Sequence, residues 1–284
     1  RSQLGNPPDF SRPLTPKRLR GIVAPNLHSP VFIVGAPRSG TSFLGNCIGA
    51  LPNVSYYHEP VATKAATRVV WNGTWSVEEA ERFFRLVFRL LLGLQLAGDL
   101  RFAQKTPRHA FIVDFLYKWF ETPHFIHLIR DGRDAAYSYS QKPWLSARSP
   151  HKGFEPGGAK YGPHPRFWVE PDRRDEFCQT SDLHRCIWAW RRHVEAALDK
   201  LDAVPPELTL TVRYESLVRY PKFEARRILH FLDVTEGANR RAMHSALEAA
   251  RTDSIGRGPR RLSDRQYTTI EAEAGDLLHK LDYF

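Results

Sequence analysis

Residues 35–42 form a glycine-punctuated stretch whose side chains are suited to binding an anion. Its glycines have the G-x-x-x-x-G spacing of a Walker phosphate loop, but Thr41 stands where that loop has its lysine. The only cation of the stretch is Arg38, which precedes the second glycine. An enzyme that hydrolyses nucleoside triphosphates needs the Walker lysine on the terminal phosphates. The displaced cation therefore favours a different phosphate-bearing ligand.

The segments on either side of this loop predict how it is presented. Residues 31–34 are apolar and rich in valine and isoleucine, which predicts a short buried strand. Residues 41–50 contain no proline and predict a helix. In such a unit the glycines let several N–H groups point at one anion beside the positive end of the helix. The alternative is a turn between strand and helix that binds nothing.

Length and charge limit the class of protein. At 284 residues the chain is long enough for one large α/β domain, and no linker-like segment divides it. Hydrophobic residues make up 42% and charged residues 25%, as in ordinary globular proteins. Basic residues outnumber acidic ones by 41 to 31, which gives a net charge of +10 and favours either solubility or attraction of a polyanionic ligand. The arginines are spread along the chain, so no nucleic-acid partner is expected.

Cysteine usage indicates a reducing compartment, and the hydropathy pattern predicts no membrane span. The three cysteines, Cys47, Cys178 and Cys186, do not make a disulfide framework. Free thiols in a reducing compartment are expected, and a pair between Cys178 and Cys186 is the alternative. The apolar run at residues 86–96 is too short to span a membrane and contains an arginine. No signal peptide is visible, so a cytoplasmic location is expected; the start at Arg1 leaves open a signal or anchor that was removed.

Strand-like and helix-like segments alternate from residue 31 onward, which predicts a parallel sheet with helices on both faces. The predicted strands cover residues 31–34, 54–57, 102–104, 124–129 and 208–214. The predicted helices cover residues 41–50, 76–96, 108–120, 134–141, 181–201, 221–232, 235–250 and 263–281. The predicted fold class is therefore α/β, with a P-loop-type parallel sheet flanked by helices.

Three segments precede or interrupt this alternation. Residues 1–30 are rich in proline and are expected to form an extended lead-in to a single domain at residues 31–284. Residues 142–180 contain many prolines and glycines interleaved with aromatic residues, which predicts an insertion on the substrate side of the domain. Residues 252–262 are expected to form a loop rich in glycine and arginine.

Four separate stretches resemble motifs of the sulfotransferases that use 3′-phosphoadenosine 5′-phosphosulfate (PAPS), in the order of that family. They are residues 35–42, Arg130 with Ser138, residues 213–217 (Arg-Tyr-Glu-Ser-Leu) and residues 254–258 (Ser-Ile-Gly-Arg-Gly). The resemblance covers residues 31–284 and is specific because the four motifs combine. The bacterial, carbohydrate and tyrosylprotein branches fit better than the small-phenol branch.

The resemblance implies a site for PAPS and for its product, adenosine 3′,5′-bisphosphate (PAP), with no metal ion expected. The residues expected at the 5′-phosphosulfate are Arg38, Ser39, Gly40, Thr41 and Ser42. Those expected at the 3′-phosphate are Arg130, Ser138, Arg257 and Gly258. Tyr214 is expected either to contact adenine or to pack in the core. Arg133 is expected to add charge there or to pair with Asp131 or Asp134.

Sulfuryl transfer to a hydroxyl is helped by a general base, for which Glu59 is the leading candidate. It follows the predicted strand 54–57 at the sheet edge where the phosphate loop is expected, and it matches the catalytic glutamate of an H-E-P element in the resembling branches. The alternatives are His58, His109, or a Glu59 that is only a solvated loop carboxylate. Without a catalytic role, His109 is expected on a helix surface. Lys105 resembles a lysine that some branches place on the sulfonate or bridging oxygen; a strand-end lysine without that role is equally open.

The acceptor follows from the sequence only as a class. The insertion and residues 61–75 are expected to shape its pocket, and the branch resemblance favours a carbohydrate, a lipid or another small-molecule alcohol. Two other functions remain open. One is a P-loop kinase or nucleoside triphosphatase, which the missing Walker lysine disfavours, and the other is a non-catalytic binder of anionic glycans. The sequence carries no signal for an oligomeric state.

Overall fold

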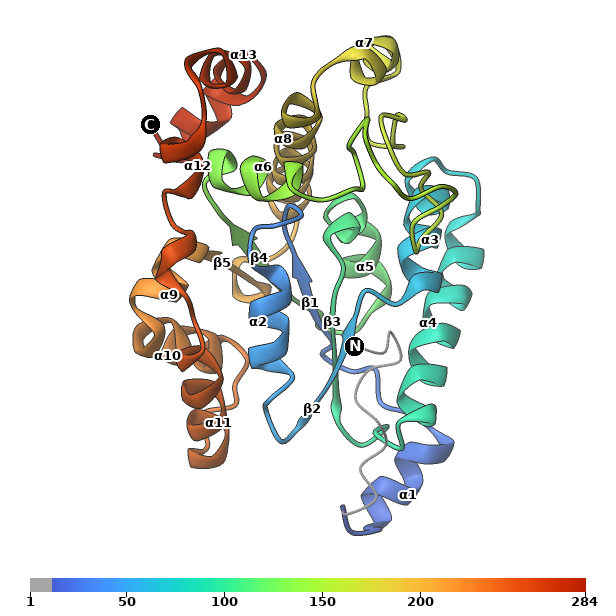
Figure 1. Ribbon diagram of the computed structural model, residues 1–284. Coiled ribbons are helices and arrows are strands. Elements are labelled where there is room, and N and C mark those ends of the chain that lie inside the picture. Colours follow the sequence, from blue (N-terminus) through green and yellow to red (C-terminus); the bar gives the residue numbers. More distant parts are fainter. Residues whose placement is uncertain (1–11) are drawn as a thin grey trace.

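The computed structural model describes residues 12–284, and its centre is a sheet of five parallel strands in the order β2-β3-β1-β4-β5 (Figure 1). The strands are β1 (Val31–Val34), β2 (Val54–His58), β3 (Arg101–Lys105), β4 (His124–Ile129) and β5 (Thr209–Arg213). They form where short apolar or β-branched runs are bounded by turn residues. The α/β class and the parallel sheet predicted from the alternation are confirmed.

Strand β1 contributes to both hydrophobic layers because its successive side chains point to opposite faces of the sheet. Phe32 and Val34 join one core cluster, whereas Val31 and Ile33 join another. The helices of the first layer are α4 (Val77–Leu94) and α5 (Val113–Trp119), and those of the second are α2 (Thr41–Ile48), α10 (Pro221–Phe231) and α11 (Gly237–Glu248). In Figure 1, α4 and α5 lie to the right of the strands, and α10 and α11 lie to their left.

A third core cluster lies near the carboxyl ends of the strands. It is built around two buried tryptophans of α8 (Asp182–Leu201), against which α6 (Gly132–Ser140) and α13 (Asp264–Lys280) pack. The indole N–H of Trp190 donates to the backbone carbonyl of Arg130 at 3.0 Å. This bond ties α8 to the residue that follows β4.

The proline-rich start of the chain contains a helix that the sequence pattern did not predict. Residues 1–30 were expected to be extended; those before residue 12 lie outside the described part, and Pro16–Val23 form helix α1. Thr15 caps this helix through its side chain, and Pro16 fits the first turn, where an N–H would have no helical partner anyway. The buried side chain of Arg18 donates to a backbone carbonyl just beyond α4 at 3.3 Å, so α1 packs against the domain.

Other segments depart from the predicted elements where a local turn or buried packing overrides the hydrophobic pattern. The additional helices are α3 (Val61–Trp71), the 3-10 helix η1 (Pro107–Ile112) at the start of the predicted helix 108–120, α9 (Tyr214–Arg219) and α12 (Arg257–Arg261). All six residues of η1 are buried, and η1 leads into α5, as 3-10 turns often do at the start of an α-helix. Helix α12 lies within the predicted loop 252–262 and begins after Gly256, whose left-handed φ of +68° lets the chain enter it.

The predicted insertion at residues 142–180 has little regular structure over most of its length. Phe154 and Lys160 pair as an antiparallel bridge, so residues 154–160 form a short hairpin. The insertion ends in a 3-10 turn and the short helix α7 (Arg174–Gln179). In Figure 1 it lies close to α3.

The described residues contain no candidate membrane span and three unpaired cysteines. No helix within residues 12–284 combines the length and the apolar character needed to cross a bilayer. All three cysteines are free thiols. Cys47 lies in the core, and burial raises its pKa to about 12, so it is a neutral packing residue.

The register of the sheet brings the predicted site residues to one edge. Lys105, the last residue of β3, is in register with His58 of β2 on one side and with Ile33 of β1 on the other. The backbone N–H of Glu59 donates to the carbonyl of Lys105 at 2.9 Å. The loop after β1 therefore lies beside Glu59 and Lys105, because parallel strands gather their carboxyl ends at one edge.

Candidate active site

The loop after β1 turns sharply into the start of α2. Arg38 and Gly40 both have positive φ, +70° and +90°, and Gly40 is the N-terminal cap of α2. A Cβ at Gly40 would lie 2.3 Å from the ring of Tyr214, so both the conformation and the packing require glycine. Thr41 and Ser42 line the adjoining cavity. The first turn of α2 thus faces the cavity with hydroxyl groups and the positive end of a helix.

Arg38 connects this loop to α6. Its Nε donates to Ser138 Oγ at 3.1 Å, although the sequence assigned these residues to opposite phosphates of one ligand. The two predicted phosphate sites are therefore adjacent. Burial and the nearby Arg130 both lower the pKa of Arg38, and two cations this close favour an anion between them. Arg133 is engaged elsewhere, because it pairs with Asp131 at 2.8 Å.

Arg130 is held rigidly against the loop. Its Nη1 donates to the carbonyl of Arg38 at 3.0 Å, and its guanidinium lies 4.5 Å from the ring centre of Tyr214. Within the described part of the chain, Arg130 Nε and the buried hydroxyl of Ser39 have no hydrogen-bond partner. Buried polar atoms are seldom left unpaired. These two donors therefore fit a ligand that brings phosphate oxygens, as PAPS does.

The late glycine loop is held by Asp134, to which the sequence assigned only a pairing with Arg133. The buried carboxylate of Asp134 accepts the N–H of Gly256 at 2.7 Å and that of Gly258 at 2.6 Å. These bonds fix the loop against α6. The structure does not bring Arg257 to the same place: its side chain is 53% exposed and pairs with Asp253 at 3.1 Å, because α12 directs it toward solvent.

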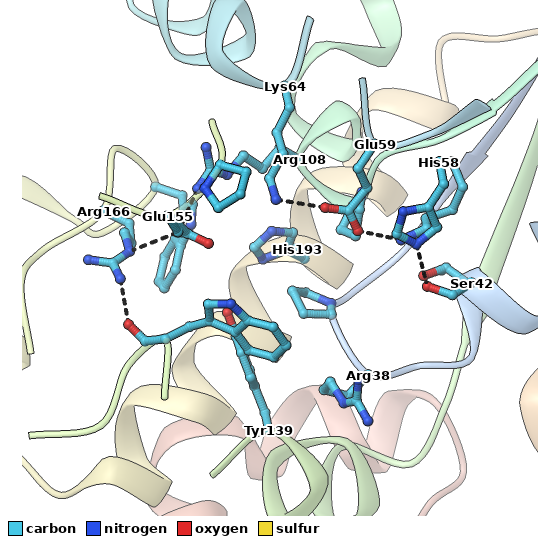
Figure 2. Close-up of a pocket in the computed structure, with 17 residues that line it drawn as sticks. Arg38, Ser42, His58, Glu59, Lys64, Arg108, Tyr139, Glu155, Arg166 and His193 are labelled. Atoms are coloured by element: carbon cyan, nitrogen blue, oxygen red, sulfur yellow. Dashed lines mark hydrogen bonds and ion pairs between the residues drawn. The ribbon is translucent and has the colours of Figure 1, made fainter. Parts of the chain in front are cut away.

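Glu59 lies between two lysines at the carboxyl edge of the sheet, and Figure 2 shows it beside one of them, Lys64. Its Oε2 accepts a hydrogen bond from Lys64 Nζ at 2.6 Å, and its Oε1 accepts one from Lys105 Nζ. Burial alone would raise the pKa of Glu59, but the two ammonium groups hold it well below its usual range, so the carboxylate is ionised. The backbone of Glu59 has a φ of +46°, a left-handed conformation that is uncommon for a non-glycine residue.

The two histidines considered as alternative bases have different surroundings. His58 lines the cavity with its Nε2 3.1 Å from Ser42 Oγ, and burial and Lys105 lower its pKa. The expectation that His109 lies on a helix surface is wrong, because η1 directs it inward and it is 1% exposed. Its Nδ1 lies 2.6 Å from Gln104 Nε2, and burial lowers its pKa to about 3. His109 is not among the residues that line the cavity.

A cavity of about 400 Å³ adjoins Glu59 and the phosphate loop (Figure 2). Its lining includes the predicted site residues Arg38, Thr41, Ser42, Glu59 and Lys105. It also includes residues that the sequence did not single out, among them Lys64, Arg108, Tyr139, Glu155, Arg166 and His193. The cavity therefore joins the predicted phosphate site to a wall formed by α3, η1, α6, α8 and the insertion.

The wall on the insertion side combines an ionic cluster with aromatic rings. Arg108 Nη2 donates to Glu155 Oε1 at 2.9 Å, and Arg166 Nε lies 3.8 Å from the same oxygen. Burial lowers the pKa of His193 to about 3, so its ring is neutral. The aromatic side chains here are Tyr139, Trp144 and Trp168. Apolar walls with a few polar groups are typical of pockets for organic ligands.

The additional lining residues differ in how far the sequence could have revealed them. Lys64 lies in the first turn of α3, five residues after Glu59, so recognition of that helix would have placed it near the base. Arg108 follows the Lys-Thr-Pro stretch that marked Lys105. Glu155 and Arg166 had no local signal, because their positions depend on how the insertion folds over η1.

Within residues 12–284, one group of side chains has the spacing of a metal site. Glu176, His184 and Glu273 place potential ligand atoms within 4.8 Å of one another. Arg173 and Arg191 already bind the Glu273 carboxylate at 2.9 and 2.8 Å. This cluster between α7, α8 and α13 is therefore an ion-pair network.

The fold and the site together define a class of protein. A parallel sheet carries a phosphate loop with an arginine instead of the Walker lysine, and Arg130 and Ser138 lie beside it. Residues 28–261 match the family described as the sulfotransferase domain. The chain therefore belongs to the sulfotransferase family, a family of enzymes that use PAPS.

Similar curated proteins are protein-tyrosine sulfotransferases. Protein-tyrosine sulfotransferase A of Caenorhabditis elegans is 24% identical over 229 residues, which cover 74% of this chain and 51% of that protein. The protein-tyrosine sulfotransferase of Drosophila melanogaster is 22% identical over 220 residues, which cover 72% of this chain and 38% of that protein. The match thus spans about half of one relative's length and less than half of the other's.

Solved structures of sulfotransferases share the fold. The sulfotransferase domain from the curacin biosynthetic pathway superposes with a TM-score of 0.55 at 15% identity, over 88% of this chain and 97% of that one. Sulfotransferase STF9 from Mycobacterium avium superposes with a TM-score of 0.54 at 16% identity, over 92% of this chain and 79% of that one. At these identities the likeness concerns the fold alone.

Proposed function

We propose that this protein transfers a sulfuryl group from PAPS to an acceptor hydroxyl and releases PAP. The observation that carries the proposal is that one cavity is lined both by the cation of the phosphate loop, Arg38, and by an ionised carboxylate, Glu59. The unpaired donors are Ser39 of the phosphate loop and Arg130, which bonds to the backbone of that loop. These groups together match the needs of a phosphosulfate donor and of a hydroxyl that must lose a proton.

The chain's own residues have separate tasks toward the donor, whose sulfonate is the group transferred. Arg38 and the N–H groups at the start of α2 accept the negative charge that grows on the departing 5′-phosphate. Arg130 and Ser138 hold the 3′-phosphate, and the ring of Tyr214 under Arg130 fixes the guanidinium rather than adenine. Lys105 places a compact positive charge on the sulfonate.

Glu59 receives the proton of the acceptor. The acceptor oxygen forms its bond to sulfur while the bond between sulfur and the 5′-phosphate oxygen breaks, so PAP leaves with the electron pair. In the free protein two lysines weaken Glu59 as a base. When Lys105 turns to the sulfonate, one of those charges leaves, and the pKa of Glu59 rises as a base is needed.

The acceptor that we propose is an alcohol or phenol carried on a ring. The aromatic wall of Tyr139, Trp144 and Trp168 suits the flat face of a sugar or of a tyrosyl group. The similarity to protein-tyrosine sulfotransferases adds weight to a tyrosyl acceptor, whereas the sequence alone favoured a carbohydrate or another small alcohol. Tyrosyl acceptors and carbohydrate or other alcohol acceptors are therefore to be compared in the same assay.

The test is PAP release from PAPS with a panel of tyrosine peptides, sugars and lipid alcohols. Glu59→Gln is expected to lower kcat by about 100-fold or more while PAP affinity changes by less than about twofold. Glu248→Gln, an exposed glutamate on α11, is the matched control and should keep wild-type activity.

Each other outcome points to a specific failure. Full activity of Glu59→Gln would remove Glu59 as the base. Magnesium-dependent consumption of ATP, without use of PAPS, would make the protein a P-loop kinase or nucleoside triphosphatase. Binding of heparin-like polymers without stabilisation of the fold by PAP would favour a non-catalytic glycan binder.

A further inference from the structure

The two carboxylate oxygens of Glu59 have different ionic partners. Oε1 accepts from Lys105 at the end of β3, and Oε2 accepts from Lys64 on α3 at 2.6 Å. The side chains of both lysines are largely buried, with Lys105 2% and Lys64 14% exposed. The proposed transfer uses Lys105 at the sulfonate but gives no task to Lys64.

Lys64 is held in place from two directions. Its backbone N–H donates to the carbonyl of Pro60 at 2.9 Å in the first turn of α3, so it starts one helical turn from Glu59. Its aliphatic stem lies beneath Gly157 in the hairpin of residues 154–160. A Cβ added to Gly157 would lie 2.9 Å from Lys64 Cγ and 3.0 Å from Lys64 Cδ, so the hairpin backbone is in close contact with that stem.

The hairpin of residues 154–160 is hydrogen-bonded to the buried 3-10 helix η1. Arg108 of η1 donates through Nη1 to the carbonyl of Gly157 at 2.8 Å and through Nη2 to Glu155 at 2.9 Å. Within the hairpin, the N–H of Glu155 donates to the carbonyl of Ala159 at 2.7 Å. A continuous set of contacts thus runs from η1 through the hairpin and Lys64 to Glu59.

We propose that Lys64 is a positioning residue for Glu59, and that the hairpin of residues 154–160 keeps it in position. The inference rests on the proposed function, in which Glu59 takes the acceptor proton. Once Lys105 turns to the donor, Lys64 is the remaining ionic partner of Glu59 and fixes which oxygen faces the acceptor. The insertion that walls the acceptor side therefore also determines the orientation of the base.

A pH dependence follows from the charges that face Glu59. Lys64 on α3 and Lys105 on β3 lower the pKa of Glu59. His58 on β2 and His109 on η1 are the nearby titratable groups that burial keeps neutral at physiological pH. Removal of the Lys64 charge must raise the pKa of Glu59, so the loss of activity on the acid side must move to higher pH.

The experiment measures kcat and kcat/KM for the acceptor against pH, with PAP affinity by calorimetry. Lys64→Met keeps the length of the side chain and removes its charge. In this variant we expect the acid side of the plot of kcat against pH (the acid limb) to move toward neutral pH by at least about one unit, which corresponds to about a tenfold lower rate on that side. We expect PAP affinity to stay within about twofold of wild type. Lys64→Arg should restore the wild-type limb. The matched control is Lys200→Met, which removes an ion pair between Lys200 at the end of α8 and Asp114 of α5.

The hairpin's part is tested with two neighbouring glycines. Gly157→Ala should move the limb in the same direction but less, because its methyl group meets Lys64. Gly158→Ala should leave the limb unchanged, since it has a similar φ of +81° and no atom within 4 Å of the added Cβ. Both variants keep the charge of the site. The pair therefore separates backbone strain from contact of the added methyl group with Lys64 and with Arg108 Nη1, which lies 3.1 Å from it.

Failure of this inference is distinct from failure of the proposed function. If wild type transfers sulfate and Glu59→Gln does not, but Lys64→Met has the wild-type acid limb, the role of Lys64 is refuted. A uniform loss at all pH values with weakened PAP binding would mean that Lys64 binds the donor instead. If wild type does not use PAPS, or if Glu59→Gln is fully active, the proposed function fails and the inference with it.

Discussion

Replacement of Gly40 by alanine tests how the phosphate loop packs on Tyr214. The added methyl group would lie 2.3 Å from one ring atom of Tyr214 and 2.7 Å from another. Gly40 also has a φ of +90°, which alanine adopts only with strain. The ring cannot easily move away, because Arg130 lies over it at 4.5 Å and its hydroxyl lies 2.8 Å from Ser254 Oγ.

Gly153→Ala separates backbone strain from the clash. Gly153 has nearly the same φ, +87°, but no atom lies within 4 Å of its added Cβ. Strain at such a position costs about 1–2 kcal/mol, and overpacking adds about 1–3 kcal/mol. We therefore expect the free energy of unfolding to fall by about 2–5 kcal/mol in Gly40→Ala and by about 1–2 kcal/mol in Gly153→Ala.

The assay is urea unfolding of both variants together with titration of PAP. Gly40→Ala should weaken PAP binding by more than about tenfold, because the N–H groups at the start of α2 move with the loop. Gly153→Ala should bind PAP as wild type does. In a double-mutant cycle, Tyr214→Ala should recover about 1–3 kcal/mol of the Gly40→Ala loss. Equal destabilisation by the two alanines, or no coupling between Gly40 and Tyr214, would refute the packing argument.

Two further predictions concern buried carboxylates. Asp134→Asn should cost about 1–3 kcal/mol of stability and weaken PAP binding, because one of the N–H groups of Gly256 and Gly258 would face an amide donor; unchanged urea unfolding and PAP titration would contradict it. The ionic partners of Glu273 lower its pKa, against the effect of burial, to about 2, so its contribution to stability is present above the ordinary glutamate pKa and is lost as the pH falls toward 2. Wild type should therefore lose about 1–3 kcal/mol more than Glu273→Gln between about pH 4.5 and pH 2, after allowance for solvent screening; parallel unfolding curves in that range would show that the network does not stabilise the fold.

The order of elements could be predicted because it is a local property of the chain. Short β-branched runs and amphipathic stretches predicted the five strands and the long helices α4, α8 and α13, with ends that shift by one or two residues. The pattern failed at α1, where proline was taken as a sign of extended chain although Pro16 occupies the first turn of a helix. It also failed at Tyr214, where β5 passes directly into α9.

The phosphate-binding side of the site could be predicted for the same reason, since its residues lie within short motifs. The loop from Gly35 and the Arg130–Ser138 pair are adjacent to the strands that carry them, and the structure brings Arg38 within 3.1 Å of Ser138. Arg257 is the exception in this group. The sequence identified the loop that contains it, but only the folded helix α12 shows that this side chain faces solvent.

The acceptor side could not be predicted, because it is made by contacts between distant segments. Glu155 meets Arg108 across 47 residues of sequence, and no local pattern specifies where an irregular insertion will rest. The sequence left His109 as a candidate base. The structure buries its side chain, and burial of this kind depends on tertiary packing that the sequence pattern does not show.

By itself, the sequence determined the class of fold, the phosphate loop and the identity of Glu59 as a candidate base, because these depend on neighbours in the chain and on how parallel strands align their ends. Only the tertiary structure decided the state of that base. It placed Lys64 and Lys105 on the two oxygens of Glu59 and rested the hairpin on Lys64. The ionisation of a carboxylate depends on burial and on the charges around it, and those exist only once the chain has folded.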